Sequence, residues 1–442
     1  MYKLNVGFSR VDITPEQYGP MGGHGNDAHR ICTQVLDRVY GSVIAITDES
    51  GKTVLFCPCD IIHAKATVAD PTREAISAAT GIPFDHIMIN ASHNHAGPSI
   101  SAPDLEPVQE YYRYFAKQLV KAALEALEDR KPATVEIAQQ MASGLTFVRH
   151  YHMNDGTVAG PNSGSFASGV KAHITDADDQ LQLIRFVREG GRDVLLVNFQ
   201  SHVTIGAGPK LLTVMTADWP SVMRNHVEGT LGCHCGFFQG AAGNLVPSSK
   251  IPGEAIVPHD RVAFGTKLAE YVLECAEKLR AVNTGPIKVD KRTYTGDIDH
   301  SDDHLAEKAR YVSDHLYDYP AGAERTKFVK DNGFNSFLHA GGVARRARLG
   351  KDMSIDVYAL SMGDIAFITA PYEMFNSNGR FIKENSPYDM TFICTCSNDT
   401  IDYLADATTF QYDCYEVNTR RMGAGTAEKV ADLYVSMLKD MK

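Results

Sequence analysis

The amino-acid sequence predicts a single α/β domain, residues 1–442, in which mixed β-sheets are flanked by helices. Strand and helix signals alternate along the whole chain. One order of signals, a hairpin followed by a helix and then a strand, recurs three times. With 44% hydrophobic and 22% charged residues, the composition is that of an ordinary globular protein with a large core.

A threefold hairpin–helix–strand repeat is the internal organisation that we expect. The predicted units lie at residues 42–47 with 53–59, 71–79 and 86–91; at 181–187 with 193–200, 219–231 and 235–239; and at 355–361 with 365–370, 377–384 and 391–396. The unit length varies and no unit is self-sufficient, so these would be degenerate copies inside one domain. The alternative explanation is that α/β proteins commonly alternate in this way.

Polar residues fall at corresponding places in the three units. The second strand of each hairpin ends on a polar group among apolar neighbours, namely Asp60, His202 and Glu373. The closing strand of each unit runs into a polar loop, at residues 92–95, 243–244 and 398–403. Ligands of α/β sheets gather at the carboxyl ends of strands. We therefore expect six loops from across the chain to meet at one site.

The remaining segments surround these units. Helices are predicted at residues 108–129 and 424–441. A helical stretch at 304–319 and a glycine-containing loop at 332–342 separate the second and third units, and residues 160–169, rich in Gly and Ser, form an excursion. These insertions are expected to line or cover the site.

Charge and composition exclude several classes of function. The net charge of −11 argues against nucleic acid as a partner, and no run of 18 apolar residues predicts a membrane span. The first residues lack the apolar core of a signal peptide, and the nine cysteines include three closely spaced pairs inside apolar runs, which indicates buried thiols. We therefore expect a cytoplasmic protein, and enzymes of this size often form homo-oligomers.

The first candidate for chemistry is the pair His93 and His95. Two histidines at positions i and i+2 of an extended segment point to one face, and neutral imidazole is a common zinc ligand. Because the chain has seventeen histidines, such a pair is weak evidence by itself. Surface or core histidines are the alternative.

His202 and Glu373 strengthen the case, since each ends an apolar strand where a lone polar group needs a partner. Two or three histidines with one carboxylate form the ligand set of a catalytic zinc site that keeps an open position for water. Such a site activates the water and polarises a substrate carbonyl. The alternative is that Glu373 pairs with an arginine and His202 packs in the core.

Several motifs resemble those of the neutral, non-lysosomal ceramidases and their bacterial relatives. The matching runs are FSRVDITP at residues 8–15, SHNHAGP at 92–98, FVRHYHMNDG at 147–156, and the segments around 202, 370–373 and 398–416. They cover almost the whole chain in order. The resemblance therefore implies the fold of the ceramidase catalytic domain.

The resemblance also implies roles for individual residues. The zinc ligands would be His93, His202, Glu373 and Tyr403. His95 would be a general acid/base near the metal, and Arg149 and Tyr415 would bind the substrate or the oxyanion. His24 and Asn244 would contact the substrate.

Two departures from the family pattern bear on the substrate. Val246 stands where the family has a motif serine, and Ser248 and Ser249 would replace that serine only if the loop bends differently. No C-terminal β-sandwich domain is expected after the helix at 424–441. We therefore expect a zinc-dependent hydrolase of an amide, ester or lactone bond in a small soluble substrate other than ceramide. A metal-dependent lyase or isomerase acting on a hydroxy acid and a non-catalytic binding protein are the rival interpretations.

Overall fold

The computed structural model describes residues 3–24, 29–208, 210–320 and 322–442. Three units with the same order of elements form most of it. The first contains β1 (Leu4–Asp12), β3 (Tyr40–Thr47), β4 (Thr53–Cys59), α1 (Ala66–Thr80), β5 (Ile87–Ala91) and α2 (Glu106–Glu128). The second contains β6 (Lys131–Met141), β11 (Gln180–Arg188), β12 (Val194–Phe199), α3 (Asp218–Leu231), β14 (His234–Gln239) and α4 (Arg261–Ala276). The third contains β17 (Ile287–Asp297), β18 (Asp352–Met362), β19 (Ile365–Ala370), α8 (Asn376–Asn385), β21 (Met390–Thr395) and α10 (Thr426–Met441).

Strand pairing is the same in the three units, which confirms the predicted repeat. The first three strands of each unit run antiparallel to their neighbours, and the fourth pairs in parallel with the third after the crossover helix. The first two units join edge to edge through β1 and β6, in the order β14-β12-β11-β6-β1-β3-β4-β5, and β16 (Arg280–Val282) also pairs with β6. The third unit forms a separate sheet, β17-β18-β19-β21.

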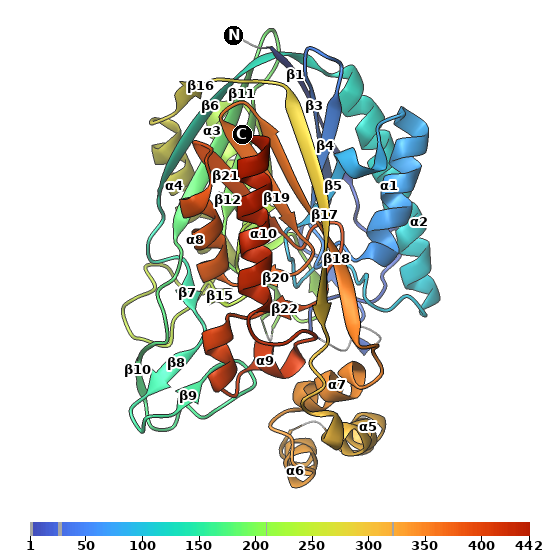
Figure 1. Cartoon of the computed structure of the whole chain (residues 1–442), viewed down its shortest axis with the longest axis vertical. Coiled ribbons are helices and arrows are strands. Elements are labelled where there is room, and N and C mark those ends of the chain that lie inside the picture. Colours follow the sequence, from blue (N-terminus) through green and yellow to red (C-terminus); the bar gives the residue numbers. More distant parts are fainter. Residues whose placement is uncertain (1–2, 25–28, 209, 321) are drawn as a thin grey trace.

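The two sheets pack face to face between layers of helices, giving four layers in all (Figure 1). Aromatic side chains from all three units meet between the sheets, where the Phe56 ring lies 4.5 Å from that of Phe367 and 6.1 Å from that of Phe238. Helices α1 to α4 cover the other face of the large sheet, and α8 and α10 cover the outer face of the small one. Because both faces of the central strands are buried, their sequences are continuous apolar runs.

The carboxyl ends of the three closing strands meet, as predicted. Strands β5, β14 and β21 are in mutual contact, and Asn90 bridges to Ser397 just beyond β21. The loops that follow these strands therefore emerge together, on the lower side of the molecule in Figure 1. Short strand pairs hold these loops: β2 (Gln34–Val35) with β13 (Val214–Met215), β7 (Phe147–Val148) with β15 (Leu245–Val246), and β20 (Glu373–Met374) with β22 (Tyr403–Leu404).

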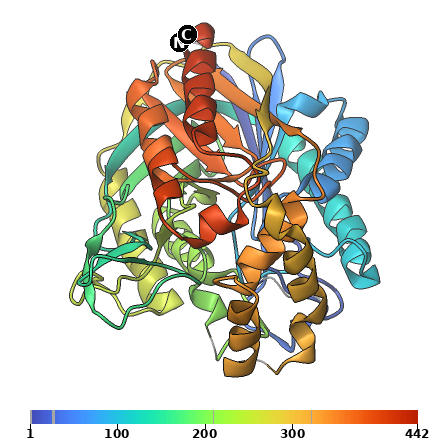
Figure 2. The ribbon, with the colours of Figure 1, turned by 60° about the horizontal axis from the view of Figure 1, so that its bottom comes forward.

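Two protrusions flank this loop cluster (Figures 1 and 2). One is a helical insertion between β17 and β18, made of α5 (Ala306–His315), α6 (Ala323–Asp331) and α7 (Phe337–Arg346), which has a small apolar core of its own. The other carries β8 (Tyr151–Met153), β9 (Val158–Ala159) and β10 (Val170–His173). The excursion predicted at residues 160–169 joins β9 to β10.

The loop predicted at residues 332–342 is wrong in part, because α7 begins at Phe337. The Ser336 side chain caps this helix by accepting a hydrogen bond from the His339 amide. A Cβ at Gly342 would lie 2.3 Å from the carbonyl oxygen of Asn418. The glycine therefore permits close packing of α7 against α9 (Tyr415–Thr419), which outweighs its low helix propensity.

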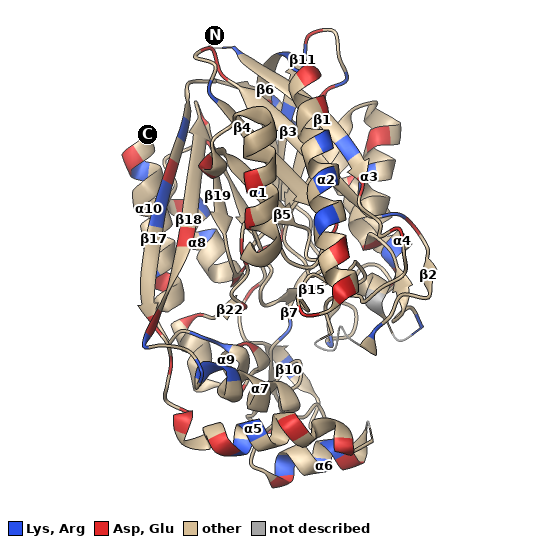
Figure 3. Ribbon diagram, turned by 90° about the vertical axis from the view of Figure 1, so that its right-hand side faces the viewer, with Lys and Arg blue, Asp and Glu red and all other residues tan. Residues whose placement is uncertain are grey.

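Charged side chains mark the outer strand of the small sheet, as Figure 3 shows for β17. This edge strand carries Lys288 and, after Val289, the run of Asp290, Lys291 and Arg292. No helix in the described part of the chain is long and apolar enough to cross a bilayer. All nine cysteines are buried and none is in a disulfide, as predicted.

Candidate active site

Three predicted ligands converge at the junction of the loops. The Nε2 atom of His93 lies 3.2 Å from Oε2 of Glu373, and Nε2 of His202 lies 3.3 Å from the same oxygen. All three side chains are buried. The three units each supply one of them: His93 follows β5, His202 follows β12, and Glu373 follows β19.

Backbone carbonyls orient the imidazole rings. Nδ1 of His93 donates to the Ile62 carbonyl at 3.0 Å, and Nδ1 of His95 donates to the Gly23 carbonyl at 2.8 Å. Nδ1 of His202 faces the carbonyls of Ala242 and Leu245 at 2.8 and 2.9 Å. Because a carbonyl only accepts, each Nδ1 carries a proton, and in the neutral ring each Nε2 presents a lone pair to the centre. Histidines that bind metals in proteins are held in this way.

The donor set fits a metal ion better than a hydrogen-bonded network. Two ligands about 2.1 Å from a tetrahedral zinc ion would lie about 3.4 Å apart. The two distances to Glu373 Oε2 are close to this value and longer than the ~2.8 Å of a charged N–H···O bond. Oε2 is buried and has no hydrogen-bond donor among the described residues. His95 Nε2 lies 3.1 Å from His93 Nε2, so in the neutral rings two lone pairs face each other, which a shared proton or a metal ion would relieve.

Electrostatics at the centre favour a positive charge. Burial lowers the pKa of His93, but the Glu373 carboxylate and Cys396 outweigh burial and raise the pKa to about 10. Burial and the Arg149 charge lower the pKa of His202 to about 4. The carboxyl pKa of Glu373 lies well below its usual range, because the neighbouring histidines outweigh its burial. Glu373 thus carries a buried negative charge that a cation at the centre would neutralise.

Tyr403 is held beside Glu373 by the backbone. These two residues are paired in register in the parallel strands β20 and β22, and the Glu373 amide donates to the Asp402 carbonyl at 2.9 Å. The Tyr403 ring is buried, lies 5.4 Å from that of Tyr415, and is within 5.4 Å of the Arg149 guanidinium. The structure thus places Tyr403, which the resemblance implies as the fourth ligand, next to Glu373 in the lining of the cavity described below.

Backbone strain is concentrated around this centre. Six described residues other than glycine have positive φ, and four of them lie in its loops: His93 at 62°, Cys396 at 53°, Asn398 at 61° and Asp402 at 74°. The left-handed region is costly for such residues and persists where the surrounding structure imposes it. Contacts around the centre therefore hold His93 and Cys396 in a conformation that Asn and Asp adopt more readily.

Arg149 is fixed by a partner that the sequence did not reveal. Its Nε donates to Glu416 at 2.6 Å, and its Nη1 lies 3.3 Å from Nε2 of His202. Glu416 is fully buried and also pairs with His150 Nε2 at 2.7 Å. Arg149 and His150 hold the carboxyl pKa of Glu416 at about 2, against the effect of burial. A carboxylate next to Tyr415 in a polar segment gave no signal of this role.

His63 is a second site residue missing from the prediction. Its Nε2 lies 3.8 Å from Oε1 of Glu373, and its Nδ1 is buried without a hydrogen-bond partner among the described residues. His63 is the fourth residue after β4, whereas His202 and Glu373 are the third residues after β12 and β19. The repeat was therefore a signal that could have found it.

Asp60, predicted at the corresponding strand end, does not reach the centre. Both of its carboxylate oxygens accept hydrogen bonds from the Arg224 guanidinium, each at 2.7 Å. This buried ion pair joins β4 to α3, so the role of Asp60 is structural. The loop that follows β4 still reaches the centre as predicted, because His63 of that loop lies beside Glu373.

The two predicted substrate contacts differ in position. The His24 ring meets the His95 ring edge-on at 5.8 Å, next to the centre. The residues that follow His24, 25–28, lie outside the described residues. Asn244 is buried, and its side-chain oxygen accepts hydrogen bonds from Asn376 at the start of α8. It therefore has a structural contact and does not line the cavity described below.

The segment that contains Val246 supports His202. Val246 pairs with Phe147 across the two short strands, and the Leu245 carbonyl binds His202 from the same segment. Ser249 donates to Glu254 at 2.6 Å and does not line the cavity, so it does not replace the motif serine.

A cavity of about 420 Å³ opens onto the candidate metal centre. Its floor contains His63, His93, His95, Glu373 and Tyr403. The helical insertion forms its roof, mainly with apolar side chains: Val312, Leu316, Tyr317, Phe337 and Leu338. Tyr415 and Arg345 line its side. The reacting part of a substrate would thus lie between the polar floor and an apolar roof.

Comparisons with known proteins show the fold and not the substrate. No protein-family model and no curated protein sequence matches this chain. The solved structure of neutral ceramidase from Pseudomonas aeruginosa matches it with a TM-score of 0.72 at 16% identity, covering 100% of this chain and 75% of that one. A structure of a ceramidase complexed with C2 gives the same values. The predicted ceramidase-like fold is therefore confirmed.

Proposed function

We propose that this protein is a zinc-dependent hydrolase of an amide, ester or lactone bond in a small substrate other than ceramide. The observation that carries the proposal is the convergence of His93 Nε2 and His202 Nε2 on one buried oxygen of Glu373, with both Nδ1 atoms held by backbone carbonyls. The similarity of the fold to a ceramidase, an enzyme that cleaves an amide, supports hydrolysis as the reaction.

The ligand types favour zinc. His93, His202, Glu373 and Tyr403 would hold the ion, through two imidazole nitrogens and two oxygens. Such a mixed set suits zinc better than magnesium or calcium, which prefer oxygen ligands alone. When bound, the ion would lower the pKa of water and polarise a carbonyl group.

The chain's own side chains would then handle protons and charge. Because Nδ1 of His95 donates to the Gly23 carbonyl, its Nε2 is left to take a proton at the centre and pass it to the leaving group. The guanidinium of Arg149, held by Glu416, places a fixed positive charge beside the reaction centre. Together with the Tyr415 hydroxyl on the cavity wall, it would stabilise negative charge that develops on a carbonyl oxygen.

Two features support a substrate other than ceramide. Val246 stands in place of the motif serine, and its methyl groups neither donate a hydrogen bond nor attack a carbonyl. The cavity at the centre, about 420 Å³, lies toward the small end of the ~300–1,000 Å³ range of ligand sites. A lipid with two long chains would have to extend outside this cavity.

Metal analysis of matched histidine variants tests the proposal. We expect about one zinc per chain in the wild type, and less than about half an equivalent in His93→Ala, because it lacks a ligand. His95→Ala should keep its zinc and lose activity, since this ring moves protons in the proposal. His226→Ala, on the exposed side of α3, is the control and should retain both.

Product analysis completes the test. Zinc-loaded protein should cleave at least one member of a panel of esters, lactones and N-acyl compounds, with products that gain the mass of one water. An unchanged product mass would point to isomerisation. A folded wild type that purifies with little zinc would contradict the metal assignment itself.

A further inference from the structure

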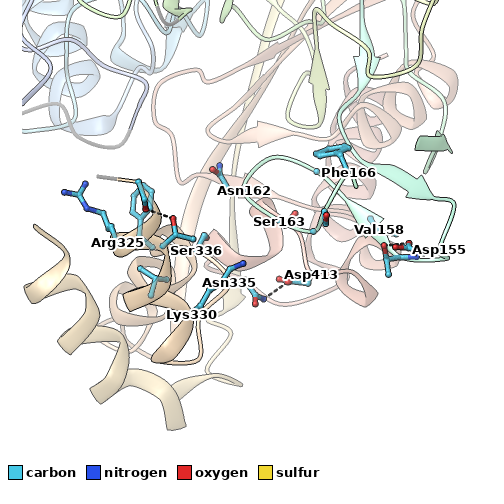
Figure 4. Close-up of a pocket in the computed structure, with 18 residues that line it drawn as sticks. Asp155, Val158, Asn162, Ser163, Phe166, Arg325, Lys330, Asn335, Ser336 and Asp413 are labelled. Atoms are coloured by element: carbon cyan, nitrogen blue, oxygen red, sulfur yellow. Dashed lines mark hydrogen bonds between the residues drawn. The ribbon is translucent and has the colours of Figure 1, made fainter. Parts of the chain in front are cut away.

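A second and larger cavity lies between the two protrusions, outside the candidate active site. Its volume is about 930 Å³, roughly twice the 420 Å³ of the cavity at the centre. One wall is formed by residues 155–166, around β9, and the other by α6 and the start of α7 (Figure 4). We call it the outer cavity, and the cavity at the metal centre the inner cavity.

The two cavities are neighbours. Phe337 lines both of them, and the Arg325 guanidinium on the outer wall packs over the ring of Tyr317, an inner-cavity residue, at 5.0 Å. A substrate that has its reacting carbonyl on the inner floor and extends past Phe337 would therefore enter the outer cavity.

The charges of the outer cavity do not select an ion of either sign. Arg325 and Lys330 lie on the helical wall, Asp155 lies on the opposite wall, and Asp413 lies beside Asn335, which donates a hydrogen bond to it, as Figure 4 shows. An anionic ligand would face the two aspartates, and a cationic ligand would face the two basic residues. An uncharged polar ligand avoids both repulsions.

The rest of the lining is rich in neutral hydrogen-bonding groups. The outer cavity is lined by the hydroxyl or amide side chains of Thr157, Asn162, Ser163, Ser165, Thr326, Asn335 and Ser336. Thr157, Ser165, Thr326, Asn335 and Ser336 each already make one hydrogen bond within the chain, so a ligand would meet their remaining capacity. Groups of this kind both donate and accept, as do the hydroxyls of a sugar. Ser163 is 92% buried, and its hydroxyl has no hydrogen-bond partner among the described residues. This hydroxyl gains a partner if a ligand or a small side-chain movement brings one to it.

Two aromatic rings are also available to a ligand. Phe166 and Phe337 are each 39% exposed, and they stand on opposite walls of the outer cavity. A partly exposed ring offers a flat apolar surface to the C–H face of a sugar ring, while the polar lining meets its hydroxyls. This combination is absent from the mainly apolar roof of the inner cavity.

We infer that the outer cavity binds an uncharged, hydroxyl-rich group, of saccharide or polyol type, that is part of the substrate cleaved at the inner cavity. The inference rests on the proposed hydrolase, because it assigns both cavities to one substrate. It adds the chemical class of the part that is recognised outside the reacting bond.

Calorimetric titration of the zinc-loaded protein tests this inference without turnover. The probes are maltotriose, N-acetylglucosamine and mannitol as uncharged polyols, glucuronate as an anion, glucosamine as a cation, and tetraalanine as a peptide. We expect an uncharged polyol to bind more tightly than the charged sugars and the peptide. Phe166→Ala should weaken this binding about 5-fold or more, through loss of the ring surface.

Phe381→Ala is the matched control, because Phe381 is also 39% exposed but lies on α8, away from both cavities. It should bind the probes as the wild type does. Failure of every uncharged polyol to bind would overturn the inference, as would tighter binding of tetraalanine or an unchanged affinity in Phe166→Ala. Zinc content and ester cleavage, measured on the same samples, report on the proposed hydrolase separately.

Discussion

Replacing Glu416 by glutamine should destabilise the protein strongly at neutral pH. The substitution keeps the shape of the side chain but removes the negative charge that neutralises Arg149 and His150. Glu416 is fully buried, so water cannot replace that charge. Removing one partner of a buried ion pair typically costs about 3–5 kcal/mol.

The pKa of Glu416 gives a second value for the free-energy cost of removing its charge. Folding lowers this pKa from 4.5 to about 2, and each pH unit corresponds to about 1.4 kcal/mol, so the charge contributes about 3 kcal/mol. Because the folded-state pKa is the lower one, this contribution is complete above about pH 5 and is lost as the pH falls toward 2. The cost of Glu416→Gln should thus decrease from about 3 kcal/mol at pH 7 to about 1 kcal/mol at pH 3.

Urea unfolding of both proteins at pH 7 and pH 3 measures these values. The control is Glu270→Gln, which breaks the ion pair with Lys267. The side chains of Glu270 and Lys267 are 48% and 32% exposed. The substitution should therefore lower the free energy of unfolding by less than about 1 kcal/mol at either pH. The double variant Arg149→Met with Glu416→Gln should be more stable than Glu416→Gln alone, since no unpaired charge is left buried. A cost that is below 1 kcal/mol at pH 7, or equal at both pH values, would refute this reasoning.

Three further outcomes are expected. Dialysis against a chelator should lower the melting temperature of the protein, and added zinc should restore it. A ligand that binds only the folded state stabilises that state. An unchanged melting temperature would contradict a bound metal. Gly23→Ala should reduce hydrolysis at least ~10-fold while zinc is retained. Gly23 has a φ of 103°, and a Cβ there would lie 2.8 Å from Nδ1 of His95, so the substitution would displace this ring. Full activity would show that the His95 ring is not positioned by Gly23. Phe56→Ala should lower the free energy of unfolding, measured in urea, by about 3–5 kcal/mol, because the ring is buried between the sheets against Phe367. A loss below 1 kcal/mol would mean that the sheets repack.

Much of the fold could be predicted from the sequence because local patterns and global packing agree. Strands buried on both faces give unbroken apolar runs, and glycines end the crossover helices α1 and α3 at Gly81 and Gly232, both with positive φ. The order of these signals was enough to reveal the repeat. The ends of β12 and β19 then located His202 and Glu373.

The remaining parts depend on contacts between residues far apart in the chain. Asp60 meets Arg224, 164 residues away, and nothing near Asp60 distinguishes a carboxylate that pairs with arginine from one that binds a metal. The partnership of Arg149 with Glu416 spans 267 residues. Tyr403 was identified through the family resemblance, because its place beside Glu373 depends on the pairing of β20 with β22.

The charged outer strand of the small sheet has a consequence for the behaviour of the protein in solution. The end strands of the large sheet, β5 and β14, lie against β21, whereas β17 leaves a row of backbone groups at an edge. Such an edge is a template for strands of other molecules. Lys288, Asp290, Lys291 and Arg292 make pairing with a second copy of β17 costly, because side chains would have to lose water. The strand thus protects the protein from edge-to-edge aggregation at high concentration.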